Sequence, residues 1–151
     1  MNKLLTIGFN EEREFTDFSI RDLRGAVGLY FIYLTDTRIS YPLSESRLIY
    51  IGMSESRQNS IGNRLRDHRI GASGNKGLTN FINNRSTRFT YHALEFLQVI
   101  GIEYVLYLEY LFLTEFTKSL GSHPICNNQS GITPILVSPH HPLVVDWSFF
   151  K

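Results

Sequence analysis

Glu109 lies within the apolar face of a predicted helix, which is an unusual place for a carboxylate. Residues 102–120 have the periodicity of a long helix, and Glu103 and Glu115 fall well away from that face. A carboxylate in apolar surroundings is costly unless it is paired, protonated or bound to a cation. Glu109 is therefore a candidate metal ligand, and the alternative is a carboxylate at the edge of the core that meets arginine or water. The apolar side chains on this face are Ile102, Val105, Leu106, Phe112, Leu113, Phe116 and Leu120.

Arg64 and His68 are four residues apart in a segment that predicts another helix, so they share one helix face. This helix covers about residues 61–70, with Ser60 and Asn63 as candidate caps at its start. An arginine can bind two oxygens of a phosphate group, and a histidine can transfer a proton or hold a phosphate. The pair is typical of phosphate chemistry, although an exposed basic helix without a function gives the same pattern.

The same part of the chain is strongly basic. Residues 57–88 contain seven basic side chains and one acid, a net charge of +6, whereas the rest of the chain has eight basic and thirteen acidic side chains, a net charge of −5. Because the whole chain has a formal charge of only +1, we expect a local positive surface rather than general affinity for polyanions. A solvated helix face is the alternative. The basic residues of the segment are Arg57, Arg64, Arg66, Arg69, Lys76, Arg85 and Arg88.

Two tyrosines lie in predicted strands, each beside a glycine. The β-branched and aromatic segments 27–34 and 47–52 predict buried strands, and they contain Tyr30 and Tyr50. Tyrosines in such strands are usually packing residues whose hydroxyl group finds a partner. The strands alone do not decide between packing and chemistry.

The order of the strands and helices that must position these residues predicts an α+β fold, with a small antiparallel sheet of about three core strands flanked by helices. Further strands are expected at 4–9 and 87–97, and further helices within 10–24 and at 77–84. The segment between the first two core strands is a long hairpin-like loop. The aromatic residues Trp147, Phe149 and Phe150 should anchor an extended C-terminal tail on the core.

Length and composition agree with one soluble domain spanning residues 1–151. Hydrophobic residues make up 42% of the 151 residues and charged residues 19%, so the chain should fold. One cysteine excludes an internal disulfide and a cysteine-rich zinc module. Cys126 with His123 makes only a weak thiol-hydrolase candidate, and His140 and His141 are interpreted as surface residues. No apolar run is long enough for a membrane span, so we expect a cytoplasmic protein without a membrane partner.

The chain resembles the GIY-YIG nuclease domain family in five ordered features across about residues 26–130. Gly28-Leu29-Tyr30 stands where the family has GIY, and Tyr50-Ile51-Gly52 repeats YIG. Arg64 and His68 follow on a helix, Glu109 matches the metal-binding glutamate, and Asn127 matches the closing asparagine. The extensions at 1–25 and 131–151 lie outside this core.

The resemblance implies a DNA endonuclease that hydrolyses phosphodiester bonds with one divalent cation, Mg²⁺ or Mn²⁺. In such an enzyme Glu109 would bind the metal, Arg64 would clamp the phosphate, and Tyr30 and Tyr50 would position the attacking water, one of them as the base. His68 would assist proton transfer, and Asn127 would orient Glu109 or the phosphate. The basic residues expected to contact the DNA backbone are Arg57, Arg66, Arg69, Lys76, Arg85 and Arg88.

Two departures from the family pattern and several alternatives stay open. Nineteen residues separate the two tripeptides, which makes the intervening loop an elaboration, and Met53 stands where relatives often have a basic or polar residue. A non-catalytic nucleic-acid-binding module of the same fold is the alternative function, and a structural domain with an accidental match is the third. RNA remains an alternative substrate, and the protein acts as a monomer or a homodimer.

Overall fold

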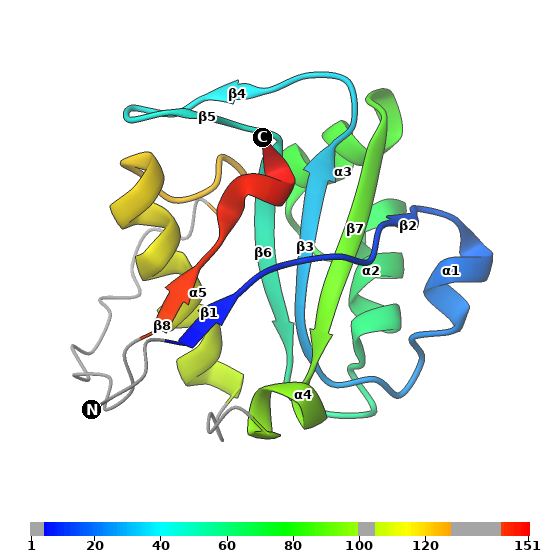
Figure 1. Ribbon diagram of the computed structural model, residues 1–151. Coiled ribbons are helices and arrows are strands. Elements are labelled where there is room, and N and C mark those ends of the chain that lie inside the picture. The colour runs from blue at the N-terminus through cyan, green and yellow to red at the C-terminus, as the bar shows by residue number, and fades with distance from the viewer. Residues whose placement is uncertain (1–4, 100–104, 128–142) are drawn as a thin grey trace.

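A four-stranded antiparallel sheet forms the centre of the molecule (Figure 1). The computed structural model describes residues 5–99, 105–127 and 143–151. The strand order in the sheet is β2-β7-β3-β6, so β3 and β7 are central and β6 is an edge strand. These strands are β2 (Arg13–Glu14), β3 (Gly28–Leu34), β6 (Leu48–Ser54) and β7 (Thr87–Ala93).

Helices cover the sheet on both sides. The five α-helices are α1 (Asp17–Arg21), α2 (Ile61–Ile70), α3 (Lys76–Asn84), α4 (Leu94–Val99) and α5 (Val105–Leu120). The short strands β1 (Leu5–Ile7) and β8 (Leu143–Val145) pair in parallel, and β4 (Ile39–Ser40) pairs with β5 (Glu45–Ser46). The chain ends in a 3₁₀ turn, η1 (Trp147–Phe150). This arrangement confirms the expected α+β class with an antiparallel sheet flanked by helices.

The sheet separates two apolar clusters, which explains why its central strands are apolar on both faces. Alternate residues of β3 enter different clusters: Leu29 and Phe31 pack on the side of α5, β8 and η1, whereas Tyr30 and Ile32 pack on the side of α1, α2 and α3. Every residue of β3 is buried as a result. The two tyrosines of interest, Tyr30 and Tyr50, both belong to the cluster beneath α2 and α3.

The local signals in the sequence predict α2 closely. Ser60 caps its start by accepting a hydrogen bond from the backbone N–H of Asn63, and Gly71 ends it with a φ of 86°. Both are ordinary cap devices, a serine hydroxyl at the first turn and a glycine in the left-handed region after the last turn. The expected helix at 61–70 and its cap at Ser60 are confirmed.

The expected strand at 87–97 was too long. The strand β7 stops at Ala93 and α4 begins at Leu94, whose backbone N–H donates to Val27 O. Leu94 and Leu97 both pack against the cluster on the α5 side, which is helical spacing rather than strand alternation. The hairpin-like loop after β3 is confirmed, because β4 and β5 pair within it.

The C-terminal residues close the cluster on the α5 side, as expected. Trp147 and Phe150 are buried in it, and Phe149 packs against it. Arg47 fastens this segment, since its guanidinium donates to Phe149 O and Lys151 O and its backbone N–H donates to Phe150 O. His140, His141, Ile102 and Glu103 lie outside the described residues.

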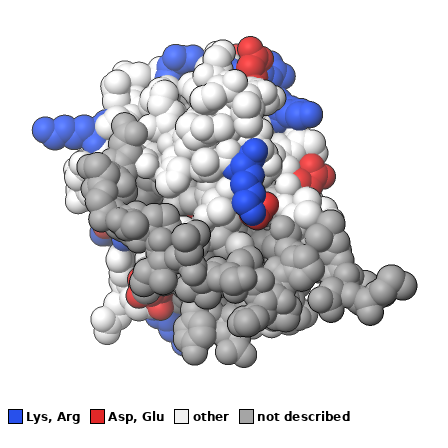
Figure 2. All heavy atoms as spheres, turned by 90° about the vertical axis from the view of Figure 1, so that its left-hand side faces the viewer, with Lys and Arg blue, Asp and Glu red and all other residues white. Residues whose placement is uncertain are grey.

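The face on the α5 side carries no continuous positive surface in the part that the structure describes. Figure 2 views the molecule from this side, and the basic side chains there form no single patch, since uncharged and acidic side chains lie between them. The basic segment of the sequence instead spans α2 and α3, across the sheet, and reaches the start of β7. None of the described helices is both long and apolar enough to cross a membrane.

The C-terminal anchor gives a stability prediction. Phe150 is 0% exposed, so Phe150→Ala should lower the free energy of unfolding by about 3–5 kcal/mol through lost burial and a cavity. Phe18 on α1 is 74% exposed, so Phe18→Ala should change it by less than about 0.5 kcal/mol. Urea denaturation of the two variants measures both, and equal effects would contradict the anchoring role of the tail.

Candidate functional site

The hydroxyl group of Tyr30 joins strand β3 to helix α2. Arg64 Nε donates to Tyr30 Oη over 3.2 Å, and Tyr30 Oη lies 2.8 Å from His68 Nε2. Because an arginine can only donate, the hydroxyl oxygen accepts from Arg64, and its own proton is available for His68. We therefore assign His68 as neutral, with Nε2 accepting from Tyr30 and the proton on Nδ1.

Burial agrees with this assignment. His68 is only 2% exposed, and burial together with the charge of Arg64 lowers its pKa to about 4. Its Nδ1 atom is buried and has no hydrogen-bond partner in the described part of the chain. Tyr30 is fully buried, and burial raises its pKa well above the usual value. The Tyr30 hydroxyl is thus a neutral, enclosed group rather than one that meets solvent.

Both tripeptide glycines are required by close packing. A Cβ atom on Gly52 would lie 2.2 Å from the ring carbon Cζ of Tyr30. Gly28 has a φ of 147°, and a Cβ atom there would lie 2.2 Å from His92 O on β7. Gly52 therefore makes the space in which the Tyr30 ring reaches α2, and Gly28 lets β3 and β7 approach each other.

Tyr50 lies closer to the surface than Tyr30. It is 8% exposed, and its ring centroid is 5.1 Å from His68 and 6.0 Å from Tyr30. Burial raises the pKa of Tyr50, the charge of Arg64 opposes that rise, and Glu109 adds to it. Tyr50 therefore lies between the positive charge of α2 and the negative charge of α5.

A smaller cavity of about 350 Å³ brings Tyr50, Arg64 and Glu109 together. Glu109 is half-buried there, and burial raises its pKa, Arg64 lowers it, and Glu55 raises it further. Glu109 thus lies at the edge of the core in a cavity that Arg64 also lines, a position that both the metal-ligand prediction and its alternative allow. The residues lining this cavity are Tyr50, Met53, Glu55, Ser56, Asn59, Arg64 and Glu109.

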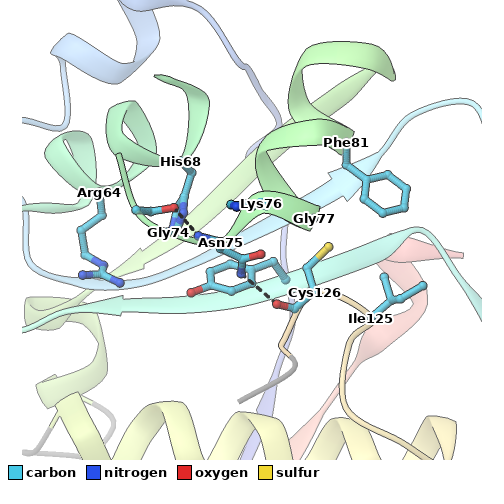
Figure 3. A pocket seen from close by; sticks show the side chains of 11 residues that line it. Arg64, His68, Gly74, Asn75, Lys76, Gly77, Phe81, Ile125 and Cys126 are labelled. Carbon is cyan, nitrogen blue, oxygen red and sulfur yellow. Dashed lines mark hydrogen bonds between the residues drawn. The ribbon is translucent and has the colours of Figure 1, made fainter. Parts of the chain in front are cut away.

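A larger cavity of about 600 Å³ adjoins the same group of residues (Figure 3). It shares Tyr50 and Arg64 with the smaller cavity, so the two hollows meet at these side chains. His68 lines only the larger one. The remaining lining residues are Ser73, Gly74, Asn75, Lys76, Gly77, Phe81, Ile125 and Cys126.

Asn127 lines neither cavity and instead completes the edge of the sheet. Its Oδ1 accepts from Ile51 N over 2.9 Å, and its Nδ2 donates to Ile51 O over 2.8 Å. The adjacent Cys126 N donates to Ile49 O, so residues 126–127 act on β6 as an additional strand would. Asn127 thus holds the backbone next to Tyr50, and it makes no hydrogen bond to Glu109 among the described residues.

The expected DNA-binding residues divide into paired and unpaired groups. Arg69 forms an ion pair with Asp17, Arg88 with Glu12, and Arg66 with the neighbouring Asp67. Within the described residues, no carboxylate pairs with the three others, which are exposed: Arg57, Lys76 and Arg85.

The weak thiol-hydrolase candidate finds no support in the geometry. Cys126 is buried, and burial raises the pKa of its thiol to about 12. A nucleophilic thiol needs a lowered pKa and access to substrate. His123 makes no hydrogen bond to the thiol in the described part of the chain.

Several cavity residues were not expected from the sequence. Glu55 and Asn59 lie in the loop that follows β6. The only feature of the sequence that could have indicated them is their position just after the second tripeptide. No sequence feature indicated the residues Ser73, Asn75, Phe81 and Ile125, which line the larger cavity. Comparison of the chain with protein-family models, curated proteins and solved structures found no match.

The buried neutral His68 predicts a pH-dependent stability. Its folded pKa of about 4 lies below the unfolded value near 6.5, so the unfolded chain binds more protons between these values. Stability from this group should be complete above pH 6.5 and should fall by about 2–3 kcal/mol as the pH drops toward 4.

Urea denaturation at several pH values in a Glu109→Gln background measures this effect, since Glu109 titrates with the opposite sign. Adding His68→Gln should flatten the pH dependence. An unchanged dependence would show that His68 is not the neutral, enclosed group described above.

Proposed function

We propose that this protein is a DNA endonuclease of the GIY-YIG type that hydrolyses a phosphodiester bond with the help of one divalent cation. The observation that carries the proposal is the convergence of Tyr50, Arg64 and Glu109 on one open cavity. Tyr30 and His68 stand directly behind these residues in a hydrogen-bonded network. Three residues from three separate elements thus line one hollow, and Tyr30 and His68 support them from behind.

Arg64 is suited to bind the phosphate that is cut. Its Nε donates a hydrogen bond to Tyr30 Oη, and this bond fixes the plane of the guanidinium group. The terminal amino groups stay available for another partner. No carboxylate lies within ion-pair distance of it among the described residues. A half-buried arginine without an ion-pair partner among the described residues can take a phosphate oxygen and stabilise the negative charge that grows in the transition state.

The donors around Glu109 fit a hard cation that prefers oxygen ligands. Glu109 and Glu55 supply carboxylates, and Ser56 and Asn59 supply neutral oxygens in the same cavity. Among the described residues, no three acidic, histidine or cysteine side chains form a closed metal cage. Mg²⁺ and Mn²⁺ tolerate this, because they are commonly held by one or two carboxylates with water and substrate oxygens. When bound, such an ion neutralises charge on the phosphate and the leaving oxygen.

The two tyrosines have different surroundings, and we infer different roles. Tyr50 lines both cavities and is the tyrosine that a water molecule beside the phosphate can reach. Tyr30 is enclosed, and its hydroxyl positions Arg64 and His68. As a base, Tyr50 needs nearby positive charge, because burial raises its pKa.

A non-catalytic nucleic-acid-binding module is the second candidate. It is favoured by the raised pKa values of both tyrosines, which leave little phenolate at neutral pH. In that case Arg64 and the unpaired Lys76 would hold a phosphate backbone without cutting it.

Cleavage of plasmid DNA separates the two candidates. With Mg²⁺ or Mn²⁺, the wild-type protein should nick or linearise plasmid, and Glu109→Gln should lower the rate by at least about a hundredfold. Glu115→Gln is the matched control on the same helix, because Glu115 pairs with Lys118 and lines neither cavity. Binding without cleavage under both metals would favour the module, and equal rates for the two variants would refute the role of Glu109.

The pH dependence tests the tyrosine roles. Since about 0.1% of a free tyrosine is ionised at pH 7, and burial lowers that fraction for Tyr50, single-turnover rates should rise from pH 6 to pH 9. Tyr50→Phe should remove this rise together with most of the activity. Tyr30→Phe should lower the rate but keep a rising profile, because it disturbs position rather than proton transfer. A flat wild-type profile would exclude a tyrosine base.

A further inference from the structure

The larger cavity has a charge opposite to that of the smaller one. Its lining includes the charged side chains of Arg64 and Lys76, and none of its described lining residues is Asp or Glu. The smaller cavity contains Glu55 and Glu109. The proposed nuclease function assigns the smaller cavity to the metal and the cut phosphate, and it leaves the larger one without an occupant.

The start of α3 forms one wall of the larger cavity and offers free donors. Asn75 caps this helix by accepting from Leu78 N, and Asn75 Nδ2 donates to Cys126 O over 3.0 Å, which fixes the helix start against the sheet. The backbone N–H groups of Lys76 and Gly77 find no acceptor in the described part of the chain. Exposed N–H groups at a helix start, with a lysine beside them, favour an anion.

A second observation points to a ligand independently of this helix. His68 lines the cavity, is only 2% exposed, and leaves Nδ1 without a partner among the described residues. Figure 3 shows its imidazole directed from α2 toward the segment that carries Gly74 and Asn75. A buried N–H donor without an acceptor is costly, and a phosphate oxygen would satisfy it.

The far end of the cavity is apolar. Figure 3 shows Arg64 at one end, Phe81 and Ile125 at the other, and Lys76 between them. Ile125 is exposed and Phe81 is half-buried, so both present apolar surface to the hollow. An occupant must therefore combine an anionic group with a flat or apolar one.

We propose that the larger cavity binds one nucleotide of the substrate strand, the one adjacent to the phosphate that is cut. Its phosphate contacts Lys76, the first N–H groups of α3 and His68, and its base lies against Phe81 and Ile125. The inference rests on the proposed function, because the shared residues Tyr50 and Arg64 place the cut phosphate at the junction of the two cavities. A volume of about 600 Å³ lies within the usual range for small-ligand sites.

Thymidine 3′,5′-bisphosphate is a suitable probe, because it carries a base and two phosphates and needs no cleavage. Titrated into the ¹⁵N-labelled protein without divalent cations, it should shift the amide signals of Lys76 and Gly77 and the His68 imidazole signal. Lys76→Ala should weaken its binding about tenfold, and Phe81→Leu should weaken it several-fold. Lys118→Ala should leave it unchanged, because Lys118 lies on α5 and does not line the cavity.

Three results would overturn the subsite: bisphosphate shifts located elsewhere, equal affinity of wild type and Lys76→Ala, or inorganic phosphate binding as tightly as the bisphosphate. The last result would leave an anion site without a place for a base. Because the titration is free of metal and turnover, it fails separately from the nuclease proposal. A protein that cuts DNA without these shifts keeps the function and lacks the subsite.

Discussion

The hydroxyl group of Tyr30 determines where the site residues can lie. It accepts from Arg64 Nε and contacts His68 Nε2, so a single oxygen fixes two side chains on one face of α2 relative to β3. The contact needs a full tyrosine ring to cross the space above β6, and only a glycine at position 52 leaves that space open. The glycine and the tyrosine therefore depend on each other, although they belong to different tripeptides. Removing either one would detach Arg64 from a defined position.

Tyr50 depends on a second constraint, at the edge of the sheet. An edge strand presents unpaired backbone groups, and β6 carries Tyr50 at such an edge. The side-chain amide of Asn127 occupies both backbone groups of the next residue, Ile51, and Cys126 N occupies Ile49 O. Tyr50 is thus bracketed on both sides by contacts from one short segment. An asparagine is suited to this, because its amide has the same donor and acceptor as a peptide group.

Local signals in the sequence predicted some of these elements and missed others for a physical reason. The helix around Arg64 and His68 was predictable to its boundaries, because its serine cap and terminal glycine act within a few residues. The end of β7 was not predictable, because the chain becomes helical at Leu94 and this places Leu94 and Leu97 against the cluster on the α5 side. The role of Asn127 depends on Ile51, 76 residues away in the sequence, and a local sequence pattern cannot predict a contact over that separation. The same holds for Phe81 and Ile125, which line one cavity from α3 and from the segment before Cys126.

The charge difference between the two cavities follows from where the acids and bases fall along the fold. Glu55 and Glu109 approach each other from the loop after β6 and from α5, and their mutual repulsion adds to burial in raising the pKa of Glu109. A cation relieves repulsion of this kind. The arrangement that destabilises the ionised form of Glu109 therefore also favours metal binding. Across Tyr50, basic side chains of α2 and α3 and the first N–H groups of α3 face a cavity whose described lining residues include no acid, so an anion would relieve the opposite imbalance. Arg64 stands on the boundary and is attracted by the acids on one side, while it leaves donors for an anion on the other. In the proposed function, a phosphodiester strand crossing Tyr50 would place a phosphate beside the basic lining of the larger cavity and would share the cation with the carboxylates of the smaller one.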